Sequence, residues 1–153
     1  MISKKKIIKI IDLAKKCSLC AMSHFKNLDS TQVHYKEDHS PLTKADLEVN
    51  KIAVEGLKKL FPDIDIVSEE FKKSHNSLKN NKIFWLVDPI DGTKEFINKS
   101  PNFTVNFALI KNNFPAFGLI AQPHTNTVWY NYNGKARKLD KNSKFENSKQ
   151  IEC

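Results

Sequence analysis

The stretch that decides the fold and the chemistry of this chain reads Ile83-Phe84-Trp85-Leu86-Val87-Asp88-Pro89-Ile90-Asp91-Gly92-Thr93-Lys94-Glu95-Phe96. The continuous apolar run at its start is typical of a strand buried on both faces. The strand delivers two carboxylates, Asp88 and Asp91, separated by the rigid Pro89-Ile90 pair. Gly92 then allows a tight turn, and we expect a short helix over Lys94–Ile97. The pattern therefore predicts a strand whose end places two carboxylates beside a helix N-terminus.

This arrangement suits a hard cation together with a phosphate. Mg²⁺ held by the two carboxylates would bridge to phosphate oxygens and neutralise their charge. A second expected strand, Ile64–Val67, leads into Glu69-Glu70, which would bring further carboxylates to the same place. Acidic groups gathered in this way repel one another unless cations are present. On spacing alone, an alternative stays open in which Asp88 and Asp91 form an Asx turn and a helix cap, with Glu69-Glu70 in a solvated loop.

Two helices are expected before this site. Apolar residues recur at three- and four-residue spacing from Ile7 to Phe25, which predicts a helix with one buried face. Ser40-Pro41-Leu42-Thr43 opens the second helix, where Thr43 and Asp46 resemble a capping box. Phe61-Pro62-Asp63 ends that helix.

The rest of the chain predicts loops and strands. Polar residues over Leu28–His39 indicate a loop with a short strand at 33–35, and Phe71–Lys82 indicates an exposed loop. Three strands follow the central motif, over Phe103–Ile110, Ala116–Gln122 and Thr127–Tyr132. Beyond Gly134 the pattern fades. Two helices and a mostly antiparallel sheet make an α+β fold.

The composition narrows the classes of function. The 153 residues suit one domain. The net charge of +8 is the excess of 25 basic over 17 acidic residues, and Arg137 is the only arginine. Scattered lysines without arginine forks argue against nucleic-acid binding. No apolar run approaches the length of a membrane span. The basic start lacks an uninterrupted apolar region, so we expect a cytoplasmic protein.

The cysteines include a formal Cys-x-x-Cys pair, Cys17 and Cys20, with His24 one helical turn later. A zinc or redox site would need a second ligand pair or a thioredoxin-like context. Neither is visible in the sequence, so we expect the pair to lie as small hydrophobic residues on the face of the first helix.

Asp88-Pro89-Ile90-Asp91-Gly92-Thr93 resembles the signature of the inositol monophosphatase family of Mg²⁺-dependent, lithium-sensitive phosphatases. Two further segments, Ser40–Asp46 and Val67–Glu70, are similar to other motifs of that family, in the same order and spacing. Within the family, Gly92–Ile97 and Phe103–Ile110 resemble the 3'(2'),5'-bisphosphate nucleotidase branch, which is associated with sulfur metabolism.

The resemblance implies a role for each matching residue. Metal ligands would be Glu69, Asp88, the backbone carbonyl of Ile90, and Asp91. Thr93, supported by Asp46, would orient and help deprotonate the attacking water, and Glu70 would hold a second-shell or third-metal water. The substrate would be held by the N–H groups of Gly92 and Thr93, with Lys94 close enough to touch it.

The implied reaction is in-line attack of a metal-bound water on the 3'-phosphate of adenosine 3',5'-bisphosphate, giving AMP and phosphate. Two or three Mg²⁺ ions would take part, and Li⁺ would inhibit. An inositol monophosphatase-type substrate is the alternative that the family leaves open.

Members of this family usually have roughly 250 residues or more, with a C-terminal α/β layer that carries a Trp-Asp-x-Ala metal-binding motif. No Trp-Asp pair occurs in this chain, so we expect residues 1–153 to form a single, incomplete domain that lacks this layer. One face or edge of the sheet would then be uncovered. We weigh four readings: an inactive truncated half, a half completed by a complementary C-terminal half or by a homo-oligomer, a minimal phosphatase, and a non-enzymatic anion-binding module.

Overall fold

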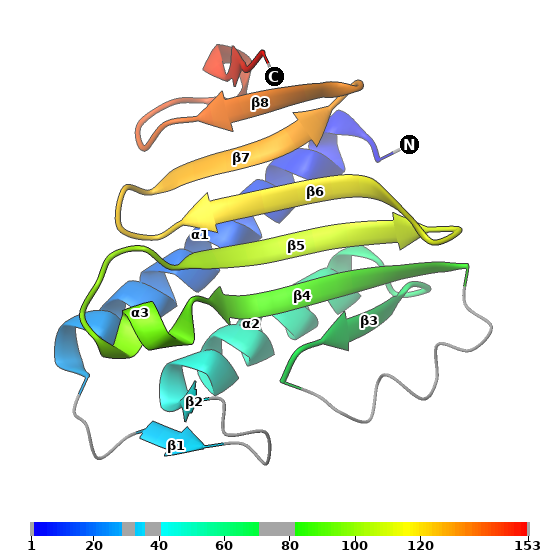
Figure 1. Cartoon of the computed structure of the whole chain (residues 1–153). Helices are drawn as coiled ribbons and strands as arrows, with labels where there is room; N and C mark the ends of the chain where they lie inside the picture. The colour runs from blue at the N-terminus through cyan, green and yellow to red at the C-terminus, as the bar shows by residue number, and fades with distance from the viewer. Residues whose placement is uncertain (1, 29–32, 36–40, 71–81, 153) are drawn as a thin grey trace.

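The computed structural model describes residues 2–28, 33–35, 41–70 and 82–152. Its helices are α1 (Lys4–Asn27), α2 (Lys44–Leu60) and α3 (Thr93–Ile97). Its strands are β1 (Val33–Tyr35), β2 (Pro41–Thr43), β3 (Asp65–Ser68), β4 (Ile83–Asp91), β5 (Thr104–Lys111), β6 (Phe114–Gln122), β7 (Thr127–Tyr132), β8 (Lys135–Leu139) and β9 (Lys149–Gln150). This composition confirms the α+β fold, with α1 and α2 forming a layer behind one large sheet (Figure 1).

The large sheet has the strand order β3-β4-β5-β6-β7-β8-β9. Only β3 and β4 run parallel among the described strands of this sheet; every later neighbour pairs antiparallel. The crossover from β3 to β4 contains residues 71–81, so the exposed loop predicted over Phe71–Lys82 lies almost wholly outside the described residues. Most of the loop predicted over Leu28–His39 does so as well.

The core lies between the two long helices and one face of the sheet. Alternate residues of β4 and β5, such as Trp85, Val87, Val105 and Phe107, are buried against the apolar sides of α1 and α2. The period-two alternation places their neighbours on the opposite face. Each helix packs on the sheet through one stripe of apolar side chains, as the spacing of these residues in the sequence predicts.

The prediction that the strand beginning at Ile83 is buried on both faces is wrong. Within β4, Leu86 is 42% exposed although Trp85 and Val87 are buried. The reason is that α1 and α2 lie on the same side of the sheet (Figure 1), and no described element covers the other side.

Two further differences concern short polar strands. Residues 41–43 form β2, paired antiparallel with β1, rather than simply opening the second helix. Strands β8 and β9 extend the sheet where the pattern fades after Gly134. Both cases depend on pairing with another segment, which local sequence does not reveal.

In the described part of the chain, no helix is both long enough and apolar enough to span a bilayer.

Candidate metal and phosphate site

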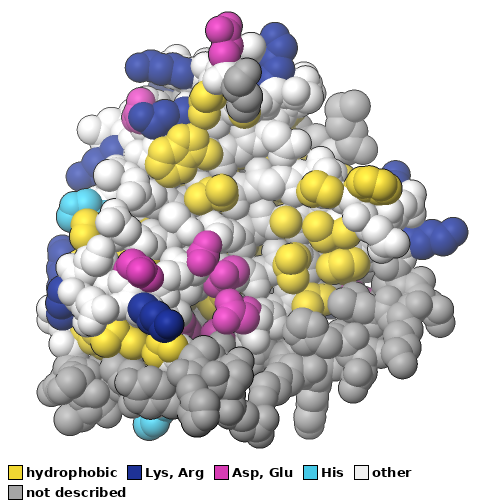
Figure 2. Space-filling view, in the orientation of Figure 1, with side chains coloured by type: hydrophobic (Ala, Val, Ile, Leu, Met, Phe, Trp, Pro, Cys, Tyr) yellow, Lys and Arg dark blue, Asp and Glu magenta, His cyan; other side chains and the backbone are white. Residues whose placement is uncertain are grey.

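The acidic residues meet because β3 and β4 are parallel neighbours. The register pairs Ser68 with Val87, so the carboxyl ends of both strands reach the same part of the sheet. The N–H of Glu69 donates to the carbonyl of Val87 at 3.1 Å, which holds the start of Glu69-Glu70 directly beside Asp88. Figure 2 shows acidic side chains gathered in one group on the uncovered side of the sheet.

A β-bulge sets the direction of the second aspartate. Asp88 pairs with Asn106 and Asp91 pairs with Thr104, so three steps along β4 match two along β5. The extra residue bends the strand and re-aims its side chains. The side-chain amide of Asn106 donates to Asp91 Oδ2 at 2.9 Å. This bond anchors Asp91 next to Asp88 on the same face.

Asp88 carries the strongest electrostatic signal in the site. Burial, followed by the negative charges of Glu69 and Asp91, raises its pKa from 3.8 to about 7. Its Oδ1 atom is buried and has no hydrogen-bond partner among the described residues. An ionised carboxylate with such an oxygen, lying among other carboxylates, is electrostatically unfavourable unless a proton or a cation is bound. The all-oxygen donor set fits Mg²⁺.

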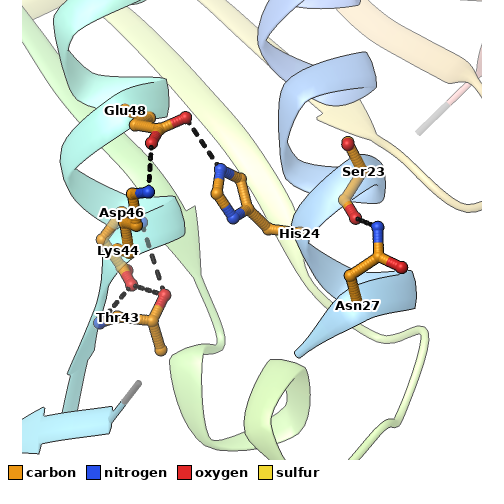
Figure 3. A network of polar contacts seen from close by, with 7 residues as sticks. All are labelled: Ser23, His24, Asn27, Thr43, Lys44, Asp46 and Glu48. Atoms are coloured by element: carbon orange, nitrogen blue, oxygen red, sulfur yellow. Dashed lines mark hydrogen bonds and ion pairs between the residues drawn. The ribbon is translucent and has the colours of Figure 1, made fainter. Parts of the chain in front are cut away.

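Thr93 connects this acidic group to α2. Its hydroxyl lies 3.3 Å from Asp46 Oδ1 and 3.1 Å from the carbonyl of Ile90. Asp46 in turn accepts from the N–H of Thr43 at 2.8 Å and from its hydroxyl at 2.5 Å. The Asp46 N–H lies 3.4 Å from Thr43 Oγ1, and this contact together with the bond from the Thr43 N–H forms the predicted capping box (Figure 3). Burial raises the pKa of Asp46, although the bonds from Thr43 and Thr93 oppose that rise.

Gly92 is required by its backbone conformation. Its φ of +94° lies in the left-handed region, and a Cβ atom would sit 3.1 Å from the carbonyl oxygen of Asn102. The chain turns there from β4 into α3, and this turn brings the Thr93 hydroxyl within hydrogen-bond distance of Asp46. Lys94 follows on the exposed side of α3.

A supporting bond positions Glu70. The buried Ser68 hydroxyl donates to Asn50 Oδ1 at 2.5 Å, and the N–H of Glu70 lies 3.3 Å from Ser68 Oγ. The turn after β3 is therefore tied to the interior side of α2.

The structure thus brings most of the predicted residues together. Glu69, Asp88 and Asp91 are electrostatic neighbours, with Glu70 adding to the same field, while Thr93 joins Asp46 and Ile90. The alternative of an Asx turn and helix cap is wrong: Asp88 and Asp91 lie within β4, and the N-cap of α3 is Gly92, without a side-chain cap bond. The metal and substrate roles of all these residues stay predictions.

Asn106 is a site residue that the sequence analysis missed. It anchors Asp91, and its own Oδ1 is buried without a partner among the described residues. The available signal was an amide side chain between the apolar residues Val105 and Phe107 of a strand. Recognising its role requires the register between β4 and β5.

Comparison with known proteins gives a consistent result. The inositol monophosphatase family matches residues 3–152. A 3'(2'),5'-bisphosphate nucleotidase, CysQ, of Buchnera aphidicola is 36% identical over 148 residues, covering 97% of this chain and 55% of that protein. A Haemophilus influenzae protein of the same name is 40% identical over 110 residues, covering 70% of this chain and 41% of its own length.

Solved structures agree on the fold. CysQ from Bacteroides thetaiotaomicron superposes with a TM-score of 0.71 at 32% identity, over 86% of this chain and 48% of that one. A Thermotoga maritima IMPase gives a TM-score of 0.72 at 28% identity, over 87% and 50%. The chain therefore spans about half the length of the curated relatives that it matches.

Proposed function

The chain belongs to the inositol monophosphatase family, and on this premise we propose that it carries the metal and phosphate site of a Mg²⁺-dependent phosphoric monoester hydrolase. The observation that carries the proposal is the buried Oδ1 of Asp88, which has no hydrogen-bond donor among the described residues and lies beside the charges of Glu69 and Asp91. Glu69, Asp88, Asp91 and the Ile90 carbonyl would hold two or three ions. When bound, Mg²⁺ would neutralise phosphate charge and lower the pKa of a water.

Thr93 and Asp46 would position the attacking water. The Thr93 hydroxyl can donate to Asp46 Oδ1 at 3.3 Å and use its lone pairs to accept a proton of the water. The raised pKa of Asp46 favours its receiving a proton from Thr93. Glu70, tied to Ser68, would hold a second water beside the ions.

The phosphate group would lie at the turn into α3. The N–H groups of Gly92 and Thr93 would donate to its oxygens, and Lys94 would contribute a positive charge from the exposed side of α3. Hydrolysis joins the water oxygen to phosphorus as the ester oxygen leaves and takes up one proton.

The substrate we propose is adenosine 3',5'-bisphosphate, which would give AMP and inorganic phosphate. The similarity to CysQ proteins named as 3'(2'),5'-bisphosphate nucleotidases supports this choice. An inositol monophosphate is the competing substrate, since an IMPase is among the structural neighbours.

A second candidate function is supported by the uncovered sheet face. Leu86, Ala108, Ile120 and Trp129 line a groove of about 700 Å³ next to Asp88 and Asn106. An apolar surface beside a catalytic site favours a half-enzyme that another polypeptide completes, either a complementary half or a second copy of this chain. On this reading the isolated chain binds Mg²⁺ but does not turn over substrate.

The test is phosphate release by the purified chain from adenosine 3',5'-bisphosphate, with inositol monophosphate as the parallel substrate. Turnover that requires Mg²⁺, falls with Li⁺ and vanishes in Asp91→Asn would support a complete hydrolase. Mg²⁺ binding by a folded chain without turnover would overturn that reading in favour of the half-enzyme. A folded chain with neither Mg²⁺ binding nor turnover would contradict both.

A further inference from the structure

A second group of metal-ligating side chains lies between α1 and α2. Cys20 and His24 are one turn apart on α1, and Glu48 faces them from α2. One ligand atom from each residue lies within 4.8 Å of the others. Figure 3 shows the His24 ring pointing from α1 toward the Glu48 carboxylate. We propose that Cys20, His24 and Glu48 form a binding site for a tetrahedral transition-metal ion of the Zn²⁺ type, with water as the fourth ligand.

The donor set distinguishes this site from the acidic one. A thiolate and an imidazole are ligands that Zn²⁺ prefers and Mg²⁺ avoids. Metal–ligand bonds of about 2.0–2.3 Å in a tetrahedron place the ligand atoms roughly 3.3–3.8 Å apart. The three ligand atoms lie within 4.8 Å of one another, so small side-chain movements would bring them to these separations. The His24 Nε2 to Glu48 Oε2 distance of 2.8 Å needs only to open slightly as the ion enters.

The Glu48 carboxylate is the charge at this site that attracts a cation, and Lys44 opposes it. The hydrogen bond from His24 lowers the pKa of Glu48, which keeps the carboxylate ionised. Burial, followed by the charge of Glu48, raises the pKa of the Cys20 thiol. The thiol therefore keeps its proton until the metal displaces it, and that proton passes to solvent. Lys44 Nζ lies 3.5 Å from Glu48 Oε1 and competes with the ion for the carboxylate.

Cys17 does not belong to this site. It is fully buried, its Sγ lies 3.9 Å from the carbonyl of Val49, and burial raises its thiol pKa to about 12. The sequence analysis asked for a second ligand pair; the structure supplies one further protein ligand, Glu48 of α2, and the fourth position is left to water. A bound ion would join α1 to α2 within two residues of Asp46.

The test is titration of the whole chain with Co²⁺, which reports thiolate coordination by a charge-transfer absorption band and tetrahedral geometry by its visible bands. Cys153→Ser is used throughout, so that Cys17 and Cys20 are the remaining thiols. We expect both signals in this background and in Asp88→Asn. Competition between Zn²⁺ and Co²⁺ then gives the relative affinities.

Cys20→Ser should abolish the thiolate band, and Glu48→Gln should weaken Zn²⁺ binding by more than the roughly 10–100-fold typical of an outer-shell partner. Cys17→Ala is the matched control and should keep the band, whereas Lys44→Gln should tighten binding. Absence of the band in the background protein would overturn the proposal. Its loss in Cys17→Ala, or its persistence in Cys20→Ser, would do the same.

Discussion

Asp88 holds its proton more tightly in the folded chain than a solvated aspartate does. Burial and the charges of Glu69 and Asp91 both oppose its ionisation. The side-chain amide of Asn106 donates to Asp91, and Asp88 Oδ1 has no donor in the described part of the chain. Ionised Asp88 therefore needs a neighbouring positive charge, which a bound metal ion would supply.

This electrostatic arrangement predicts a pH dependence of the metal-free protein. Because the folded pKa of Asp88 is about 7 and its ordinary value is 3.8, the folded state binds the proton more tightly. The free energy of unfolding should thus fall as pH rises from about 4 to about 7. Asp88→Asn should match the parent at pH 4 and be more stable at pH 8 by roughly 1–2 kcal/mol after allowance for solvent screening.

Urea unfolding of both proteins in a chelating buffer measures this difference. Equal stability of parent and variant at pH 8 would contradict the proposed electrostatic repulsion. Adding Mg²⁺ should stabilise the parent more at pH 8 than at pH 5.

Gly92 gives a second prediction at the same scale. Gly92→Ala places a Cβ at φ +94° and 3.1 Å from the Asn102 carbonyl oxygen. We expect a loss of about 2–3 kcal/mol, since the left-handed conformation alone costs about 1–2 kcal/mol. Gly134→Ala is the matched control, with φ +73° and no atom within 4 Å of the added Cβ. Equal losses in the two variants, measured by urea midpoints, would show that the close contact is unimportant.

At the scale of elements, the residues that begin α2 also form part of the candidate site. The Thr43 and Asp46 capping box fixes the first turn of α2, and Asp46 also accepts from Thr93 across 47 positions of sequence. The β4 bulge similarly serves both the sheet and the direction of Asp91. Changes to these local structures should therefore affect stability and site geometry together.

The capping box provides a direct test. Thr43→Ala removes the hydroxyl that bonds to Asp46 and should cost about 1–2 kcal/mol of stability. Ser3→Ala, at the exposed cap of α1, removes one long bond of 3.4 Å and should cost less than about 0.5 kcal/mol. Thermal unfolding of the two variants makes the comparison. A larger loss from Ser3→Ala would contradict the role assigned to Thr43.

Sequence predicted the elements whose pattern is local. The helix stripes follow from periodicity, and the strands expected over Phe103–Ile110 and Thr127–Tyr132 correspond to β5 and β7. Strand β8 was missed because its lysines and Arg137 are only partly buried, and its pairing depends on β7 and β9. The carboxylates of the site were found through their motif. Asn106 and the Glu48 contact were missed because both depend on neighbours distant in sequence.

At the scale of the whole molecule, one side of the sheet is packed and the other is not. The helices bury Trp85 and its neighbours, whereas Leu86 and Ile120 are 42% and 47% exposed on the opposite side. Figure 2 shows apolar side chains gathered there beside the acidic group. The family resemblance predicted that one face or edge of the sheet would be uncovered. The apolar run Ile83–Val87, taken alone, indicated the opposite.

The uncovered face predicts self-association of the isolated chain. Its average mass in sedimentation should rise above the 17.6 kDa of one chain as concentration increases. Leu86→Gln combined with Ile120→Lys should keep the protein monomeric without lowering its unfolding temperature, because both side chains are already exposed. Leu47→Gln, at a 50% exposed position on α2, should leave association unchanged. A parent protein that stays monomeric at all concentrations would contradict this prediction.

The most direct test of the whole account is Mg²⁺ binding by isothermal titration calorimetry at pH 8. Asp88→Asn is compared with the parent chain, and Asp140→Asn serves as the remote carboxylate control, since Asp140 pairs with Lys138. The account predicts that Asp88→Asn binds Mg²⁺ at least about 10-fold more weakly, with Asp140→Asn unchanged. Equal Mg²⁺ affinity in Asp88→Asn and the parent would contradict the assignment of the acidic group as the metal site.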